Sequence, residues 1–189
     1  MTFDLYSPIT LLTIYFATEF LVLGFKRVDK YADRRDDGSL RLIITVIWVS
    51  LGLGRIARFA VPQAQLEVLQ HIATAGVLLF FTGLVVRWAP ILHLGRFFTV
   101  EVAITREHEL IQNGCYRFVR HPSYMGLLLM FLGAGICSGN ILTLLVIEVP
   151  IFFALRYRMQ IEEAVLLEAF GERYASYMRK TKRLIPFVY

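Results

Sequence analysis

Residues 122–155 read PSYMGLLLMFLGAGICSGNILTLLVIEVPIFFAL, and the expected architecture of the whole chain follows from them. These 34 residues carry one charge, Glu148, and are too long for one membrane span but short for two spans with a loop. Because Gly and Asn adopt turn geometry at low cost, we predict a tight helical hairpin that turns at Ser138-Gly139-Asn140. Each arm is about 25 Å long at 1.5 Å per residue, so the second arm must continue past Leu155 to clear the hydrocarbon.

Three more apolar stretches precede this hairpin. Between Leu5 and Phe25 the only charge is Glu19, and residues 42–54 and 68–86 carry none. Each stretch is near the roughly 20 apolar residues that cross a bilayer. With 57% hydrophobic residues and a mean hydropathy of +0.58, the chain has too little polar surface for a water-soluble globule. We therefore predict an all-α integral membrane protein with five transmembrane helices and a cytoplasmic C-terminal helical segment.

The basic residues predict the orientation of these spans. Six Lys or Arg residues lie in 26–41, five in 87–120 and seven from 156 onward, and five spans place these 18 of the 20 on one side. The other side holds only Arg55 and Arg58. By the positive-inside rule the amino terminus is outside and the carboxyl terminus cytoplasmic. The net charge of +5 then reflects topology and attraction to anionic lipid, and not a nucleic-acid surface.

The two cysteines, Cys115 and Cys137, fall on opposite membrane faces in this arrangement. We therefore expect no disulfide between them, and two cysteines without metal-ligand spacing predict no metal site. Two acids, Glu19 and Glu148, lie within the apolar stretches, where ionisable groups are functional by default. For Glu148 a protonated or hydrogen-bonded structural role is an equal alternative.

Polar and aromatic residues crowd the segment that leads into the hairpin. Residues 107–126 read EHELIQNGCYRFVRHPSYMG. Pro122 fits a first helical turn and keeps His121 out of helical geometry. Arg120 and His121 are thus predicted at a helix start, where free N–H groups and the helix dipole form an anion site. The alternative is that Arg117 and Arg120 only mark the cytoplasmic boundary.

The extension of the second arm carries a further pair of charged residues. Arg158 and Glu162 are four residues apart on a predicted helix and so share one face, and Glu163 lies beside them. The alternative interpretation is an ordinary exposed ion pair that contributes little. Gly171 is the expected end of this helix.

Motifs stand throughout the second half of the chain. They are GRFF at 95–98, HELI-x-x-G-x-YR at 108–117, RHPSY-x-G at 120–126, R-x-x-x-EE at 158–163, FGE-x-Y-x-x-Y at 170–177 and RLIPF at 183–187. Together they resemble the isoprenylcysteine carboxyl methyltransferases, in a compact form similar to the prokaryotic members. The resemblance covers residues 95–189, whereas the first three spans resemble the family only in being hydrophobic.

This resemblance implies an enzyme that uses S-adenosyl-L-methionine (SAM) at the cytoplasmic membrane face and releases S-adenosyl-L-homocysteine. The apolar stretches and the resemblance together predict one membrane domain over residues 1–189, with three spans in 1–94 and the methyltransferase core in 95–189. Arg158 matches the arginine assigned to the substrate carboxylate, and Arg158 and Glu162 are the expected catalytic residues. Glu101 departs from the family, which has glutamine there. The implied cofactor contacts are Glu101, His108, Glu109, Leu110, Ile111, Tyr116, His121, Pro122, Ser123, Tyr124 and Glu162.

The chemistry of these residues favours methyl transfer to a carboxylate. A carboxylate is already a nucleophile near pH 7, so the protein need only position the two partners and exclude water. Arg158 can hold a carboxylate in a planar fork that lysine cannot reproduce. The expected substrate is a lipid-modified small molecule or a prenylated protein C-terminus, with membrane lipid as a further partner and no metal or nucleic acid.

Two other classes of function stay open. One is a SAM-dependent phospholipid N-methyltransferase, which would need a general base and would gain nothing from Arg158 near a cationic amine. The other is a channel, transporter or scaffold. The scarcity of charged and paired polar residues in the spans disfavours that last class.

Overall fold

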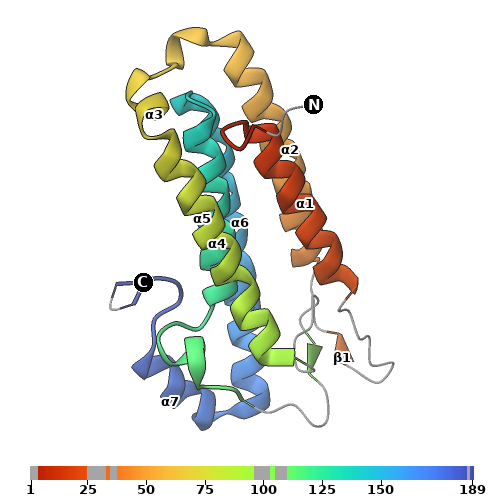
Figure 1. Cartoon of the computed structure of the whole chain (residues 1–189). Coiled ribbons are helices and arrows are strands. Elements are labelled where there is room, and N and C mark those ends of the chain that lie inside the picture. Colours follow the sequence, from red (N-terminus) through yellow and green to blue (C-terminus); the bar gives the residue numbers. More distant parts are fainter. Residues whose placement is uncertain (1–3, 25–32, 35–37, 96–102, 105–109, 187) are drawn as a thin grey trace.

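The computed structural model describes residues 4–24, 33–34, 38–95, 103–104, 110–186 and 188–189, and five long helices form its body (Figure 1). Consecutive long helices run in opposite directions. In chain order they are α1 (Pro8–Gly24), α2 (Ser39–Ala60), α4 (Ala73–Leu94), α5 (Pro122–Cys137) and α6 (Ile141–Phe170). Shorter helical elements are η1 (Pro62–Ala64), α3 (Glu67–His71), η3 (Gly114–Arg117) and α7 (Glu172–Lys180). Strands β1 (Asp33–Arg34) and β2 (Ala103–Ile104) pair antiparallel, and all the other helix and strand elements of the described residues are helical.

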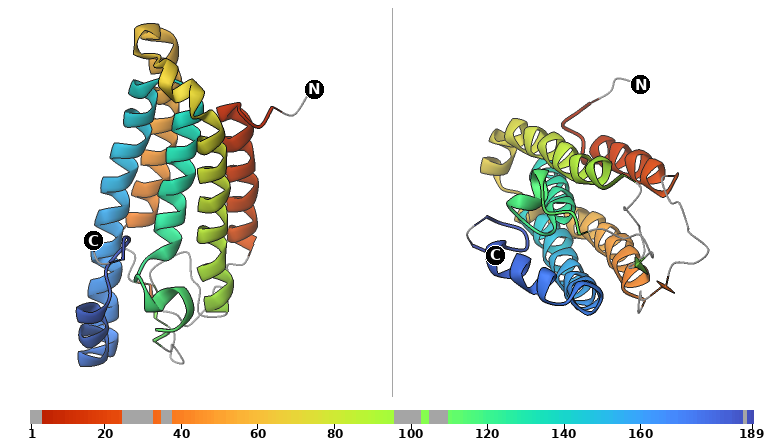
Figure 2. Two further views of the ribbon diagram at one scale, coloured as in Figure 1. Left: turned by 60° about the vertical axis from the view of Figure 1, so that its left-hand side comes forward. Right: turned by 90° about the horizontal axis from the view of Figure 1, so that it is seen from below.

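The helices are arranged around α5. Figure 2 shows α5 between the pair α1 and α4 on one side and the pair α2 and α6 on the other. In agreement with this arrangement, α5 contacts α1, α4 and α6, and α2 packs on α6. Phe80, Phe131 and Leu155 are among the buried side chains that fill the space between them. Large apolar side chains also cover the outside, where Phe20 is 76% and Phe59 67% exposed. Such an apolar exterior is expected of helices in contact with lipid.

Among the residues that the structure describes, length and composition qualify two helices as candidate membrane spans. These are α2 and α4, while α1 and α5 contain shorter apolar helices. The predicted all-α fold is therefore confirmed, whereas the predicted number of five spans stays a prediction. The free cysteines Cys115 and Cys137 lie toward opposite ends of α4. Cys115 is part of η3, which packs near the end of α4, whereas Sγ of Cys137 lies 3.4 Å from the carbonyl of Ala73 at the start of α4.

The predicted hairpin is present. Helix α5 ends at Cys137 and α6 begins at Ile141, with Gly139 at a φ of 69° in the turn. The side chain of Asn140 caps α6 by accepting a hydrogen bond of 2.9 Å from the backbone N–H of Thr143. Its amide nitrogen donates to the carbonyl of Val61 at 3.1 Å, which ties the turn to the end of α2. A capping Asn and a left-handed Gly thus fix the geometry that the sequence indicated.

Glycines allow α4 and α5 to approach each other backbone to backbone. A Cβ atom on Gly83 would lie 2.6 Å from the carbonyl oxygen of Gly126, so neither position accepts a side chain without displacement. This approach sets Arg87, one turn after Gly83, against the first turns of α5.

Helix α6 continues well past Leu155, as predicted, and ends at Phe170 because Gly171 adopts a φ of 54°. Helix α7 then turns back toward α5, and Val119 pairs with Lys182 in a short parallel bridge. The start of α5, the end of α6, α7 and the C-terminal residues therefore gather at one end of the bundle (Figure 1). Helix α3 and the 138–140 turn lie at the other end.

Candidate active site

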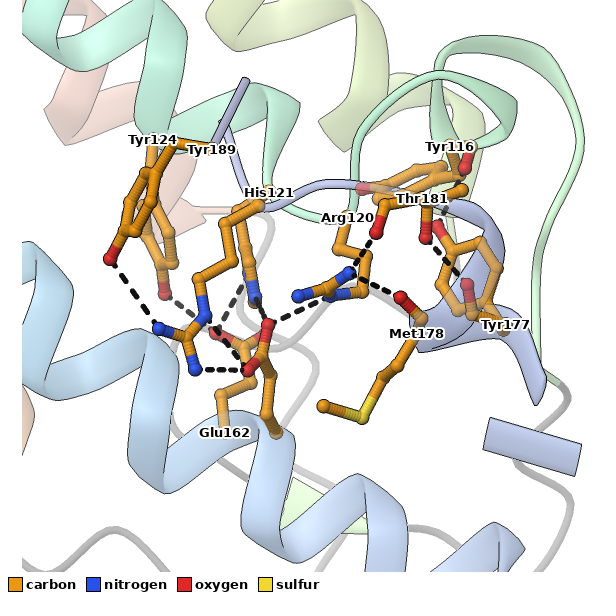
Figure 3. A network of polar contacts seen from close by, with 11 residues as sticks. Tyr116, Arg120, His121, Tyr124, Glu162, Tyr177, Met178, Thr181 and Tyr189 are labelled. Carbon is orange, nitrogen blue, oxygen red and sulfur yellow. Dashed lines mark hydrogen bonds and ion pairs between the residues drawn. The ribbon is translucent and has the colours of Figure 1, made fainter. Parts of the chain in front are cut away.

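The candidate site forms where the first turn of α5 meets the extension of α6. His121 is the N-cap residue of α5 and Pro122 occupies the first helical position, as the sequence indicated. His121 and Pro122 are both buried. The ring of Tyr124 stacks on that of His121, with centroids 5.5 Å apart and planes inclined by 17°. This turn thus presents two aromatic rings toward α6 (Figure 3).

Arg158 is buried, with 4% of its surface exposed. Its Nε donates to the hydroxyl of Tyr124 at 2.9 Å, and its Nη1 donates to Oγ of Ser39 at 2.8 Å. Ser39 is itself only 1% exposed and is not a side-chain cap of α2, whose N-cap residue is Gly38. The interpretation of Arg158 as an ordinary exposed ion pair is therefore wrong, because the guanidinium is oriented from two sides inside the protein.

The hydroxyl of Tyr124 joins the two residues that were expected to be catalytic. It accepts from Nε of Arg158 and donates to Oε2 of Glu162 at 3.0 Å. The side chain of Glu162 is 32% exposed, and Nδ1 of His121 lies 3.8 Å from its Oε2. Figure 3 shows His121, Tyr124 and Glu162 together at one side of the network. A cation, a phenol and an accessible acid thus meet at one place.

The adjacent acid, Glu163, is in a different environment. Its side chain is 4% exposed, and its Oε1 lies 2.8 Å from Nε of Arg120 and 3.1 Å from Nε2 of His121. Its Oε2 accepts from Nε and Nη2 of Arg183, at 2.9 and 2.7 Å. Burial alone would raise the pKa of the Glu163 carboxyl, but the hydrogen bonds from His121, Arg183 and Arg120 lower that pKa well below its ordinary value. Glu163 is therefore an ionised anchor, because its oxygens are already held by cations.

The predicted anion site at Arg120 and His121 is wrong as stated. Their backbone N–H groups donate to the carbonyls of Lys182 and Arg183, at 2.8 and 2.9 Å. The guanidinium of Arg120 donates to Glu163 and to the carbonyl oxygens of Met178 and Thr181. Carbonyl groups of the C-terminal segment thus accept hydrogen bonds from these N–H groups, and the residues around Arg120 and His121 in the sequence could not predict that contact. Arg120 therefore does more than mark a boundary, whereas Arg117 is exposed.

The other predicted contacts lie around this centre. Tyr116 is half-buried in η3, where its carbonyl accepts from the hydroxyl of Tyr177 at 2.6 Å and its ring lies 6.3 Å from that of His93. Leu110 and Ile111 are half-buried just before η3. The hydroxyl of Ser123 accepts a hydrogen bond from Nη1 of Arg87 in α4 at 3.0 Å. Three expected contacts, Glu101, His108 and Glu109, lie outside the residues that the structure describes.

Comparisons with known proteins agree with these motifs. A family profile described as phospholipid methyltransferase matches residues 71–173. Protein-S-isoprenylcysteine O-methyltransferase B of Arabidopsis thaliana is 32% identical over 123 residues, which are 63% of this chain and 62% of the relative. A protein of Oryza sativa subsp. indica named probable protein-S-isoprenylcysteine O-methyltransferase is 26% identical over 182 residues, 94% of this chain and 93% of its own length.

A solved structure shares the fold. The eukaryotic intramembrane Ras methyltransferase ICMT (isoprenylcysteine carboxyl methyltransferase) matches with a TM-score of 0.70 and 23% identity, over 96% of this chain and 65% of that chain. This chain thus spans less than two thirds of the ICMT chain and of the Arabidopsis relative. At this identity the structural match establishes the arrangement of helices, and the function must be argued from the site.

Proposed function

Because this chain belongs to the phospholipid methyltransferase family, whose profile matches residues 71–173, we propose that it is a SAM-dependent carboxyl O-methyltransferase. Its acceptor is the carboxylate of a lipid-modified, isoprenylcysteine-type molecule, either a small molecule or a prenylated protein C-terminus. The names of the Arabidopsis and rice relatives support this substrate class. The other product is S-adenosyl-L-homocysteine.

Arg158 is the proposed ligand of the acceptor carboxylate. Its side chain is buried, and the hydrogen bonds from Nε to Tyr124 and from Nη1 to Ser39 fix the plane of the guanidinium. A fixed planar cation can align a carboxylate, whose geometry it matches, and alignment of reacting groups is a large part of catalysis. No proton has to be removed from a carboxylate near neutral pH, so the site needs no general base for it.

The residues around Glu162 fit a SAM molecule. When bound, SAM supplies an electrophilic methyl group on a positively charged sulfur. Glu162 keeps about a third of its side chain exposed, and its carboxylate can accept hydrogen bonds from hydroxyl or ammonium groups. Glu163 cannot take this role, because Arg120, His121 and Arg183 already occupy its oxygens. Leu110 and Ile111, which are half-buried, offer apolar surface to the rest of the molecule.

One observation carries the proposal: the hydroxyl of Tyr124 lies within hydrogen-bond distance of both Arg158 and Glu162. The residue proposed to bind the carboxylate and the residue proposed to bind the cofactor therefore contact the same phenol. A methyl donor held by Glu162 and an acceptor held by Arg158 would face each other across Tyr124. Direct methyl transfer between two bound molecules requires that they be held close together in this way.

The name of the family, phospholipid methyltransferase, points to a second candidate, a phospholipid N-methyltransferase. Its acceptor would be an amine with a pKa near 10, which must lose a proton before it can attack. Arg158 would repel such an ammonium by roughly 4 kcal/mol at 4 Å and an effective dielectric constant of 20. The buried Arg158 therefore favours the carboxylate acceptor.

The site is proposed to face the cytoplasm. Five spans with the amino terminus outside put the three basic segments on the cytoplasmic side, and residues 1–189 then form one membrane domain with the methyltransferase core in 95–189. The alternating direction of the long helices and the gathering of the site at one end of the bundle support this arrangement (Figure 1).

Transfer of label tests the proposed function. Purified protein in detergent is incubated with methyl-labelled SAM and a farnesylcysteine-type acceptor, and label in the acceptor is the expected result. Arg158→Lys keeps the positive charge but loses the planar fork, so it should lose most of the transfer and keep its affinity for the cofactor. An Arg158→Lys protein as active as the wild type would contradict the role of Arg158.

A further inference from the structure

A bidentate ion pair lies beside the candidate site and has no part in the chemistry proposed above. Nε and Nη2 of Arg87 in α4 donate to both carboxylate oxygens of Glu19 in α1, at 2.5 and 2.7 Å. The two side chains are 11% and 22% exposed. This pair joins two helices that are otherwise apolar over most of their length.

The third guanidinium nitrogen of Arg87 points at the site. Nη1 donates to Oγ of Ser123 at 3.0 Å and reaches its carbonyl oxygen at 3.5 Å. The backbone of Arg87 also packs directly on Gly126, one turn further along α5. Arg87 is therefore fixed by Glu19 on one side and holds the first turn of α5 on the other. Each guanidinium nitrogen already donates a hydrogen bond, so Arg87 is poorly suited to bind an anion of its own.

Stability alone is a weak explanation for this pair. Removing two charges from water is unfavourable, and replacing a buried ion pair by apolar residues is often neutral or stabilising. Ser123, the residue that Arg87 contacts, directly precedes Tyr124 in the turn that also carries His121. A small shift of reacting groups is enough to slow an enzyme strongly.

We propose that Arg87, oriented by Glu19, is a positioning residue that holds Ser123 and the first turn of α5 in the geometry that binds SAM. The proposal deepens the proposed function and rests on it, because Ser123 is a cofactor contact only in a SAM-dependent enzyme. It gives α1 a role in the site although α1 contributes no group to the centre formed by Tyr124, Arg158 and Glu162.

The test separates positioning from stability. The double variant Glu19→Leu/Arg87→Met replaces the pair by apolar residues of similar size, and thermal unfolding in detergent should be unchanged or shifted upward. Calorimetry with S-adenosyl-L-homocysteine should show an affinity about tenfold lower, whereas KM for a farnesylcysteine-type acceptor should be unchanged. The single variant Arg87→Met leaves Glu19 unpaired and should unfold at a lower temperature.

Ser123→Ala shows whether the effect passes through Ser123. Added to the wild type it should weaken S-adenosyl-L-homocysteine binding, and added to the double variant it should weaken binding less, because the two changes remove one interaction. If the double variant does not fold, Arg87→Lys serves instead. The compact ammonium of lysine cannot reproduce the planar guanidinium that donates to both oxygens of Glu19 and to Ser123, so the cofactor affinity should still fall.

Native cofactor affinity in a folded double variant, or in Arg87→Lys, would overturn the proposal. Fully additive effects of Ser123→Ala would overturn it as well. A wild-type protein that does not bind S-adenosyl-L-homocysteine is a different result, because it would contradict the proposed function itself.

Discussion

Nη1 of Arg158 donates to Oγ of Ser39 at 2.8 Å, although 119 positions separate these residues in the chain. Ser39 begins α2, and Arg158 lies on the extension of α6, so the contact depends on the packing of these two helices. The serine hydroxyl is buried and orients a charged group that we propose to bind the acceptor. Under this proposal Ser39 helps to align the substrate, although it has no catalytic chemistry of its own.

Ser39→Ala should therefore raise KM for the acceptor. A hydrogen bond to a charged group contributes about 1.5 kcal/mol, which corresponds to roughly a tenfold change. Steady-state kinetics with a farnesylcysteine-type acceptor measures it, and S-adenosyl-L-homocysteine affinity should be unchanged. Ser50→Ala, at another buried serine of α2, is the matched control and should leave KM unchanged. Equal effects of the two variants would show that Ser39 is only a packing residue.

Tyr124→Phe should uncouple the two halves of the site. The phenol accepts from Arg158 and donates to Glu162, so a ligand on one side should strengthen binding on the other. We expect about a fivefold gain in acceptor affinity when S-adenosyl-L-homocysteine is present, a coupling near 1 kcal/mol. Calorimetry with and without S-adenosyl-L-homocysteine should show this gain in the wild type and lose it in Tyr124→Phe. A gain that survives the substitution would place the coupling elsewhere.

Glu163→Gln should destabilise the protein by about 3 kcal/mol at pH 7, because it leaves buried cations without their anion. The lowered pKa of the Glu163 carboxyl also predicts that the stability of the protein depends on pH. The contribution of Glu163 to the free energy of unfolding is complete above the ordinary carboxyl pKa of about 4.3. It is lost as the pH falls from there through the lower pKa of Glu163 in the folded protein. The gap in unfolding temperature between wild type and Glu163→Gln should thus narrow below about pH 4.

Glu172→Gln is the control for this pH series. Glu172 also pairs with an arginine, Arg179, but the two side chains are 80% and 63% exposed. Exposed pairs of this kind contribute little, so Glu172→Gln should unfold near the wild-type temperature at every pH. A Glu163→Gln gap that does not change with pH would show that the carboxylate is not the source of the stability.

The proposed topology can be read by cysteine labelling. In a protein with Cys115 and Cys137 replaced, Gln63→Cys should react with an impermeant reagent from outside the cell and Lys182→Cys only after the cytoplasmic side is opened. Both side chains are exposed. Gln63 lies in η1, next to the segment that pairs with Asn140 of the hairpin turn, whereas Lys182 pairs with Val119 near the start of α5. Labelling of both positions from the same side would contradict the five-span arrangement.

Local features of the sequence were sufficient for the helices and for part of the site. The Gly139-Asn140 turn and the break at Gly171 depend on a few adjacent residues, and both predictions are confirmed. The resemblance of the motifs to isoprenylcysteine carboxyl methyltransferases is confirmed by the relatives. Spacing also placed Arg158 and Glu162 on one helical face, where a single residue of α5 contacts both.

Long-range packing decided what the sequence could not. Glu162 and Glu163 are neighbours, yet contacts from Arg120, His121 and the C-terminal Arg183 make Glu163 an anchor and leave Glu162 accessible. The motif RLIPF, which contains Arg183, was part of the resemblance to the family, but the sequence indicated no role for Arg183. Glu19 was indicated as an acid within an apolar stretch, but its partner Arg87 and the contact of Ser39 with Arg158 had no local signal, because each contact forms between helices distant in sequence.

The chemical stability of the transferred methyl group tests the central claim most directly. Purified protein is given methyl-labelled SAM together with a farnesylcysteine-type acid and phosphatidylethanolamine, and the labelled product is treated with mild base. A carboxyl methyl ester releases volatile labelled methanol, and an N-methyl group does not. We predict label that is released as methanol and that migrates with the farnesylcysteine product. Base-stable label that migrates with phosphatidylethanolamine derivatives would contradict the account and identify an amine methyltransferase.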